Sequence, residues 1–286
     1  MHASFRNGER MAESVHEAVL AALRNSRKYG DICEATLDRI AGRAGQRHPR
    51  AKEALKAAKR KLHQACGAYL DPMDLDAIDR RLASVPTGAK EEDLLVPCLD
   101  ILRRHASTVE RIPLLNVLYR DVFAETGPPR SILDIACGLN PFTLPWMKLP
   151  PSTPYHAVDI DRPLLERVQA FLSKVGRAGS VACRDVLVTP PTTEVDVVFL
   201  LKALPCIEQQ ERGAAVRLLG ALRARYAVVS FPARSLGGRD KGMPVHYGDF
   251  MKNLMDQLKF GVKRLAYSEE TCYICTLRRY AGNGST

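Results

Sequence analysis

The sequence predicts an α/β protein in which a mostly parallel sheet follows a separate α-helical domain. From residue 131 onward, short apolar runs that end near acidic residues alternate with helical patterns. This alternation is typical of a parallel sheet with helices on both faces. Before residue 94 the patterns are those of several helices. The chain has 286 residues, 46% of them hydrophobic, which is enough for one substantial core and a second small one.

The N-terminal domain is expected to cover residues 1–93, and the second domain residues 94–286. Helices are predicted around Met11–Arg24, Cys33–Gly42 and Ala51–Tyr69. The third helix is amphipathic at about 100° per residue. Its apolar side holds Leu55, Ala58, Leu62, Ala65, Cys66 and Tyr69, and an adjacent stripe holds Lys52, Lys56, Lys59, Arg60 and His63. The boundary is predicted in S-V-P-T-G-A-K-E-E-D (Ser84–Asp93), where small, proline, glycine and charged residues separate two periodic segments.

Two helices are predicted between this boundary and the first strand. One lies near Leu94–Arg104, and the other follows H-A-S-T-V-E-R at His105 and ends before Gly127. Ser107 and Glu110 fit a capping box at the start of the second helix. Pro113 then falls early inside that helix, where a proline kinks or breaks the hydrogen-bond ladder.

The stretch S-I-L-D-I-A-C-G-L-N-P (Ser131–Pro141) predicts the first strand and a ligand-binding turn. Its apolar run suits a buried parallel strand, and Gly138 lets the backbone turn and approach a ligand closely. The stretch lacks the three glycines of a dinucleotide site and the Lys-Ser/Thr of a P-loop, which argues against NAD and ATP. Asp134 and Gly138 alone are weak evidence, because an ordinary strand-to-loop corner has the same pattern.

Two further acidic strand ends strengthen the case for a nucleoside. Y-H-A-V-D-I-D (Tyr155–Asp161) predicts a second strand, whose Asp159 can accept the ribose hydroxyls of an adenosine. S-V-A-C-R-D-V (Ser180–Val186) predicts a third strand, with Asp185 placed to accept an adenine amino proton and the next backbone N–H to meet a ring nitrogen. Each aspartate alone could be a helix N-cap or a turn residue. Three acidic strand ends in register favour a site for S-adenosylmethionine (SAM).

The alternation of strands and helices continues toward the C-terminus. D-V-V-F-L-L (Asp196–Leu201) and Y-A-V-V-S-F (Tyr226–Phe231) predict two more strands, with a helix from about Gln209 to Arg223 between them. Cys272 and Cys275 lie in another strand-like run, and no second pair stands at zinc-finger distance, so zinc is not expected. The cysteine spacing of a radical iron–sulfur enzyme is absent as well, so the methyl donor is expected to react by simple displacement.

Several long strings of unusual sequence follow one another along the chain. They are K-Y-G at Lys28, K-L-H-Q-A-C-G-A-Y at Lys61, H-A-S-T-V-E-R at His105, L-D-I-A-C-G-L-N-P at Leu133, D-V-L-V-T-P-P at Asp185 and F-P-A-R-S-L-G-G-R-D-K-G-M at Phe231. Together they closely resemble the aminoglycoside-resistance 16S ribosomal RNA methyltransferases. The resemblance implies a class I SAM-dependent methyltransferase with a Rossmann-like, mostly parallel seven-stranded sheet. It also implies methyl transfer to N7 of the guanine conventionally numbered 1405, in the decoding A site of the 30S subunit, and hence aminoglycoside resistance.

The resemblance also assigns roles to single residues. Arg111 is expected to grip the methionine carboxylate through two hydrogen bonds. Lys202 and Arg239 are the candidates for positioning the target nucleotide, since guanine N7 offers a lone pair, carries no proton and needs no general base. The structural alternatives are a surface ion pair for Arg111 and a helix cap for His105. The other expected cofactor contacts are His105, Asp134, Ala136, Gly138, Asp159, Asp185 and Val186.

The net charge of +10 is concentrated at the N-terminus. Residues 1–70 contain fourteen Lys and Arg against seven Asp and Glu. A basic segment of this kind points to an anionic partner, although basic surface is often only a solvated face. Few aromatic residues interleave with the charges, which favours phosphate and shape recognition over base stacking. The expected RNA contacts are Arg43, Arg47, Arg50, Lys52, Lys56, Lys59, Arg60 and Lys241.

Two other functions stay open. Leu204-Pro205-Cys206 resembles the nucleophile motif of RNA cytosine-C5 methyltransferases, but Ser230-Phe231-Pro232 stands where those enzymes have a second cysteine. The other alternative is a catalytically silent RNA-binding module, against which Arg111, Asp159 and Asp185 argue. No segment reaches the length of a membrane span and no apolar signal core stands at the N-terminus. We therefore expect a cytoplasmic monomer that acts on 16S rRNA within the 30S subunit, with SAM and without a metal ion.

Overall fold

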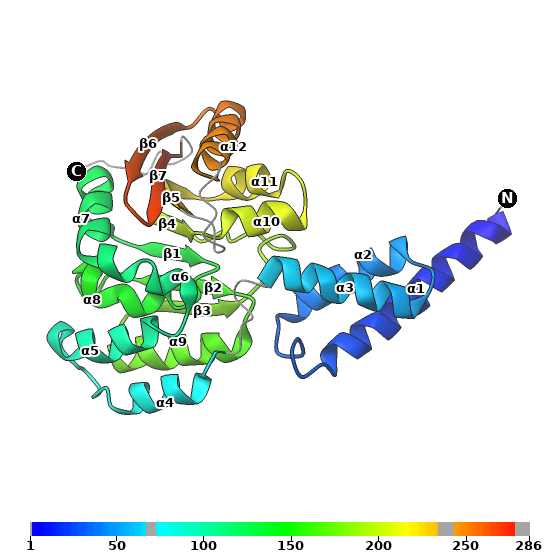
Figure 1. Cartoon of the computed structure of the whole chain (residues 1–286), viewed down its shortest axis with the longest axis horizontal. Helices are drawn as coiled ribbons and strands as arrows, with labels where there is room; N and C mark the ends of the chain where they lie inside the picture. The colour runs from blue at the N-terminus through cyan, green and yellow to red at the C-terminus, as the bar shows by residue number, and fades with distance from the viewer. Residues whose placement is uncertain (1, 67–72, 234–242, 278–286) are drawn as a thin grey trace.

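The computed structural model describes residues 2–66, 73–233 and 243–277. Within these ranges a seven-stranded sheet forms the centre of the larger unit, in the order β3-β2-β1-β4-β5-β7-β6 (Figure 1). Strands β1 to β5 pair in parallel with one another, and β7 runs antiparallel to β5 and β6. The predicted mostly parallel, seven-stranded sheet is confirmed. The strands are β1 (Ile132–Ile135), β2 (Tyr155–Asp159), β3 (Gly179–Cys183), β4 (Val195–Leu201), β5 (Ala224–Pro232), β6 (Gly261–Ala266) and β7 (Glu270–Thr276).

Alternate residues of the strands face two hydrophobic cores, one on each side of the sheet. In β1, Ile132 packs into the first core, whereas Leu133 and Ile135 pack into the second. Because both faces are covered, the central strands are apolar throughout. The first face is covered by α4 (Leu75–Ala83), α5 (Glu91–Leu102), α7 (Leu115–Thr126), α8 (Leu144–Met147) and α9 (Arg162–Lys174), and the second by α10 (Leu204–Gln210), α11 (Ala214–Ala221) and α12 (Met243–Leu258).

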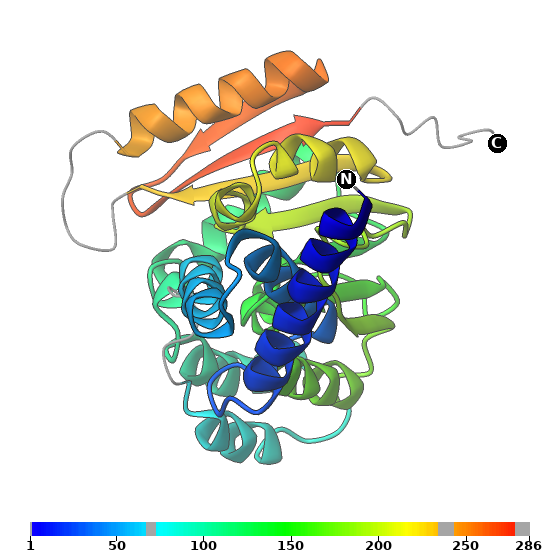
Figure 2. The ribbon, with the colours of Figure 1, turned by 90° about the vertical axis from the view of Figure 1, so that its right-hand side faces the viewer.

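Helices α1 (His2–Arg24), α2 (Glu34–Arg47) and α3 (Ala51–Cys66) form a separate unit with its own core. This unit lies to one side of the sheet (Figures 1 and 2). In α3, Ala54, Ala58 and Leu62 are buried at helical spacing. The predicted third helix begins at Ala51 as expected, and its last predicted residue, Tyr69, lies outside the described residues.

Helix α4 packs into the first core of the sheet. Its Ile78 and Leu82 are buried in the same core as Ile132 of β1. The change from one core to the other therefore falls between Leu62 and Ile78, ahead of the boundary predicted at Ser84–Asp93. The proline and glycine of that stretch form the turn between α4 and α5, because such residues mark turns within a domain as readily as linkers between domains.

Two predicted helices are interrupted. The segment after His105 divides into α6 (Ala106–Val109), the 3-10 turn η1 (Ile112–Leu114) and α7, with Pro113 in the turn. The N-cap of α6 is His105, and no side chain caps the backbone N–H groups at this helix start, so the predicted capping box of Ser107 and Glu110 does not form. The helix predicted from about Gln209 to Arg223 corresponds to the last residues of α10 and to α11, because Glu211 is extended and Gly213 has a left-handed φ of 79° between them.

Candidate active site

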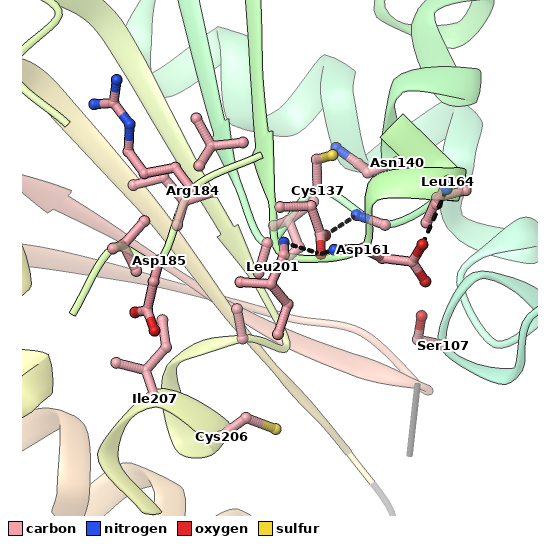
Figure 3. A pocket seen from close by; sticks show the side chains of 18 of the residues that line it. Ser107, Cys137, Asn140, Asp161, Leu164, Arg184, Asp185, Leu201, Cys206 and Ile207 are labelled. Carbon is pink, nitrogen blue, oxygen red and sulfur yellow. Dashed lines mark hydrogen bonds between the residues drawn. The ribbon is translucent and has the colours of Figure 1, made fainter. Parts of the chain in front are cut away.

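A pocket opens at the carboxyl ends of β1, β2 and β4. β2 and β4 flank β1 on opposite sides, so the strand order reverses here, and such a switch point is the usual ligand site of a parallel sheet. The first residues after β1 and β4, Ala136 and Lys202, have left-handed φ values of 52° and 59°. Strained backbone of this kind is common at functional sites. Figure 3 shows Asp185 and Cys206 on one side of the hollow and Asp161 and Ser107 on the other.

Gly138 and Asp159 shape the pocket between β1 and β2. The Asp159 carboxylate accepts backbone N–H bonds from Gly138 at 2.9 Å, Ile160 at 2.6 Å and Asp161 at 3.2 Å. Burial raises the pKa of Asp159, and these donors partly offset the rise. Gly138 has a left-handed φ of 48°, and a Cβ placed there would meet no atom within 4 Å. The space beside Gly138 is thus open to a ligand.

Asp185 and Val186 line the pocket just beyond the end of β3. Asp185 is only 3% exposed, and its Oδ1 accepts the Leu187 backbone N–H at 2.9 Å. Its Oδ2 accepts from Nε of Arg39, which comes from α2, at 2.8 Å. A carboxylate has about four lone-pair sites, so the expected bond from an adenine amino group still has an acceptor.

His105 and Arg111 line the pocket from the segment before β1. Nδ1 of His105 lies 2.7 Å from Oγ of Ser107. The buried Arg111 donates from Nε and Nη2 to the Glu270 carboxylate at 3.0 and 2.9 Å, and from Nη1 to Oδ1 of Asn140 at 3.1 Å. Burial lowers the pKa of Arg111, but the Glu270 carboxylate outweighs burial and the net shift is upward. The two-pronged grip expected for a methionine carboxylate is made here to Glu270.

Asp134 does not line the pocket, whereas Ala136 does. Side chains alternate along a strand, so Asp134 lies on the same face as Ile132, beneath the pocket. Its Oδ2 accepts from the Tyr155 hydroxyl at 2.5 Å and from Nδ2 of Asn140 at 3.0 Å. Burial raises the pKa of Asp134 to about 7, and these two bonds offset part of the rise. Asn140, which does line the pocket, connects Asp134 to Arg111.

Lys202 is buried behind the pocket wall, at 5% exposure, and only its neighbours Leu201 and Ala203 line the pocket. Its Nζ donates to the Ser107 carbonyl oxygen at 3.1 Å and to the Glu110 carboxylate, and lies 3.7 Å from Glu270. Lys202 therefore fixes the segment between α5 and η1 in this structure. Arg239 and Lys241 lie outside the described residues.

The expected RNA contacts on the N-terminal unit differ in their environment. Arg43 forms an ion pair with Glu211 of the sheet domain, and Nη1 of Arg50, just before α3, lies 3.3 Å from Oε1 of Glu53 in the first turn of α3. Lys61, which is not one of the expected contacts, has a pKa lowered first by burial and then by the positive charges of neighbouring arginines. Of the expected RNA contacts, those exposed on the surface of this unit are Arg47, Arg50, Lys52, Lys56, Lys59 and Arg60.

Three residues that are important at the site are not among those expected from the sequence. Glu270 gave one signal, since it is a carboxylate at the start of an otherwise apolar strand-like run. No sequence pattern pointed to Thr36 or Arg39, because both line the pocket from α2, which belongs to the N-terminal unit. Arg39 stands 146 positions before the aspartate that it contacts, and no local periodicity reports a contact over that distance.

The polar groups of the pocket fit SAM. The carboxylates of Asp159 and Asp185 suit the hydroxyls and amino group of an adenosine, and open space lies beside Gly138. The guanidinium of Arg111 suits a carboxylate. Among the described residues, no three His, Cys, Asp or Glu side chains are placed to hold a metal ion. None of the helices described is both long and apolar enough to cross a membrane.

The family model for ribosomal RNA methyltransferase (FmrO) matches residues 25–274. The sequence is similar to two 16S rRNA (guanine(1405)-N(7))-methyltransferases. That of Micromonospora rosea is 35% identical over 88% of this chain and 93% of its own length, and that of Serratia marcescens is 37% identical over 80% and 85%. The structure is similar to that of the 16S rRNA methyltransferase RmtF in complex with S-adenosyl-L-homocysteine, with a TM-score of 0.78, 33% identity, and 92% and 98% of the two chains covered. It is also similar to the 16S rRNA methylase RmtB, with a TM-score of 0.77, 28% identity and the same coverage.

Proposed function

Because the chain belongs to the FmrO family of ribosomal RNA methyltransferases, we propose that it transfers a methyl group from SAM to N7 of guanine 1405 in 16S rRNA. The observation that carries this function is the pocket at the β1–β4 switch point, with Asp159, Asp185 and Arg111 around it. The activity makes the protein an aminoglycoside-resistance methylase.

In this reaction the main contribution of the protein is to align the guanine base with the methyl group of SAM. Bound SAM supplies a methyl group on a positively charged sulfur. Guanine N7 has an in-plane lone pair and no proton, so no side chain has to act as a general base. Holding the base in line with the methyl group can account for several kcal/mol, roughly 7 to 11 at most, of the barrier.

The proposed division of labour among the site residues follows their contacts. Asp159 and Asp185 hold the adenosine through their remaining lone pairs, and Gly138 leaves room for the methionyl chain. Arg111 is proposed to face the methionine carboxylate while Glu270 holds its guanidinium in place. Lys202 is proposed to position the target through the segment that its ammonium group ties down, and Arg239 to contact the target nucleotide directly.

Positive charge on the protein supports rRNA as the substrate. The exposed cations of α3 offer a basic surface for rRNA phosphates. A guanine within a helical stem has to be flipped out of the stack, which costs a few kcal/mol that protein–RNA contacts must offset. We propose that the enzyme works as a monomer on the assembled 30S subunit, in the cytoplasm where that particle is found.

The test is to map the methylated nucleotide. Unmodified 30S subunits are incubated with the protein and SAM, the rRNA is treated with borohydride and aniline, and reverse-transcription stops are located. A SAM-dependent stop at guanine 1405 is expected from 30S subunits, and none from the same subunits with guanine 1405 replaced by adenine. A stop at another nucleotide, or methyl incorporation without cleavage, would contradict the proposal.

A further inference from the structure

The N-terminal helical unit supplies part of the cofactor pocket wall. Ile32, Thr36 and Arg39 line the pocket together with residues from the sheet. Backbone contacts fix this segment just beyond the end of β2. Ile32 forms an antiparallel bridge with Asp161, and the Cys33 N–H donates to the Ile160 carbonyl oxygen at 2.7 Å. The start of α2 is therefore held against the strand end that carries Asp159.

Thr36 lies in the first turn of α2. The residue is 1% exposed and lines the pocket, and among the described residues its Oγ1 has no hydrogen-bond partner. Buried hydroxyl groups are nearly always hydrogen-bonded, either within the protein or to a bound molecule. Because Thr36 lines the pocket, a molecule bound there could supply the missing partner.

Arg39 stands three residues further along α2, so it lies on the same helix face as Thr36. Its Nε donates to Asp185 at 2.8 Å, and its Nη2 donates to Oε1 of Gln210 at 2.6 Å. Both side chains of the Arg39–Asp185 pair are largely buried, at 10% and 3% exposure. The arginine from the N-terminal unit thus fixes the carboxylate proposed to accept the adenine amino group.

We propose that helix α2 completes the cofactor site. The Thr36 hydroxyl bonds a polar atom in the adenosine part of SAM, and Arg39 is a positioning residue that holds Asp185 in its accepting orientation. The inference rests on the assignment of SAM to this pocket. Its consequence is that the unit that carries the basic surface of α3 also sets part of the cofactor affinity.

The first experiment measures binding of S-adenosylhomocysteine (SAH) to the full-length protein by titration calorimetry. Thr36→Val keeps the side-chain shape and removes the hydroxyl, so SAH affinity should fall about two- to tenfold, which is the range for one neutral hydrogen bond. Thr36→Ser keeps the hydroxyl and should bind SAH close to wild type. Without SAH, the valine variant should melt at the same or a higher temperature, because an unpaired buried hydroxyl is gone.

The outcomes separate this inference from the proposed function. Wild-type protein that does not bind SAH would contradict the SAM assignment itself. If wild-type protein binds SAH and Thr36→Val binds it with the same affinity, only the proposed role of Thr36 is overturned.

The second experiment compares two arginines of the N-terminal unit. Arg39→Ala should weaken SAH binding about ten- to hundredfold, because a charge-assisted contact to the adenine acceptor is lost. Arg27→Ala is the control, since Arg27 is an exposed arginine in the turn after α1 and does not line the pocket. Circular dichroism checks that both variants are folded. Equal SAH affinities for the two variants would overturn the positioning role of Arg39.

Discussion

Five buried polar side chains form one connected network under the pocket. Glu270 bonds Arg111, Arg111 bonds Asn140, and Asn140 and Tyr155 both bond Asp134. Burial acts to raise the pKa of Glu270, but the charges of Arg111 and Lys202 outweigh it and lower the pKa overall. Such a network specifies one arrangement, because removing a single partner leaves a buried charge or donor unsatisfied.

Asp134 gives this network a pH dependence. Its pKa is raised by burial from 3.8 to about 7 in the folded protein, so folding favours the protonated form. The stability contributed by this proton is complete below about pH 4 and is lost as the pH rises toward 7. The shift corresponds to at most about 4 kcal/mol. Asp134→Asn keeps an acceptor for Tyr155 and Asn140 and has no proton to lose.

Urea unfolding of wild type and Asp134→Asn between pH 4.5 and 8 tests this dependence. We expect the asparagine variant to gain stability relative to wild type as the pH rises, because other titrating groups cancel in the comparison. A difference between the two proteins that does not change with pH would show that Asp134 has an ordinary pKa.

Cys206 separates N7 chemistry from cytosine-C5 chemistry. It is half-buried and lines the pocket from α10, where a covalent nucleophile would have to stand. Guanine N7 needs no enzyme–base adduct, so Cys206→Ala should methylate 30S subunits at a rate within a few fold of wild type. Label transfer from SAM measures this. If Cys206→Ala no longer methylates 30S subunits but still binds SAH, cytosine-C5 chemistry is supported. A covalent adduct between the wild-type Cys206 thiol and RNA would support it as well.

At the scale of elements, the exposed face of α3 offers a test of RNA binding. Lys52, Lys56 and Arg60 lie on its surface. Reversing all three charges to Glu should weaken 30S binding and leave SAH affinity unchanged. The slope of log affinity against log salt should fall by about two to three units if all three meet phosphates.

Filter binding at several salt concentrations measures affinity and slope together. The control reverses three exposed cations outside α1–α3, Arg80, Lys90 and Arg223, and should bind 30S subunits as wild type does. If the α3 variant keeps the wild-type affinity and salt slope, this face of α3 is exposed to solvent and does not contact rRNA phosphates.

Sequence patterns predict the five parallel strands within a few residues of their observed bounds. β1, β4 and β5 are apolar runs because helices cover both faces, whereas β3 is largely exposed and is indicated by its place after a helical pattern. The patterns do not single out β6, an exposed edge strand with a lysine and an arginine at its centre, or α12, which contains Pro244 and Gly248. Asp134 was expected in the pocket because its spacing fits, but strand alternation turns its side chain to the other face.

At the scale of the whole molecule, the two units meet largely through contacts between residues far apart in sequence. Arg39 and Asp185, Arg43 and Glu211, and Lys61 and the Gln209 carbonyl are each separated by more than a hundred positions. Local periodicity predicts a basic helix at α3 but contains nothing about where that helix docks. The link between the N-terminal unit and the cofactor pocket therefore emerges only from the folded chain.

This organisation predicts that the N-terminal unit opens more easily than the sheet. Its core is small and includes several alanines, such as Ala41, Ala54 and Ala58, whereas the sheet has a large core on each face. Regions with less buried apolar surface open at lower free energy. Native-state hydrogen exchange should therefore give the interior amides of α1–α3 a lower opening free energy than those of β1, β4 and β5.

Saturating SAH should then slow exchange in α2 as well as in the strand ends, because a ligand that contacts both units stabilises the state in which they are docked. In Thr36→Val that added protection of α2 should be smaller at equal SAH occupancy. Exchange of α1–α3 at the same opening free energy as β1 would show that the molecule unfolds as one cooperative unit. Protection by SAH confined to the strand ends would show that the cofactor is bound by the sheet domain alone.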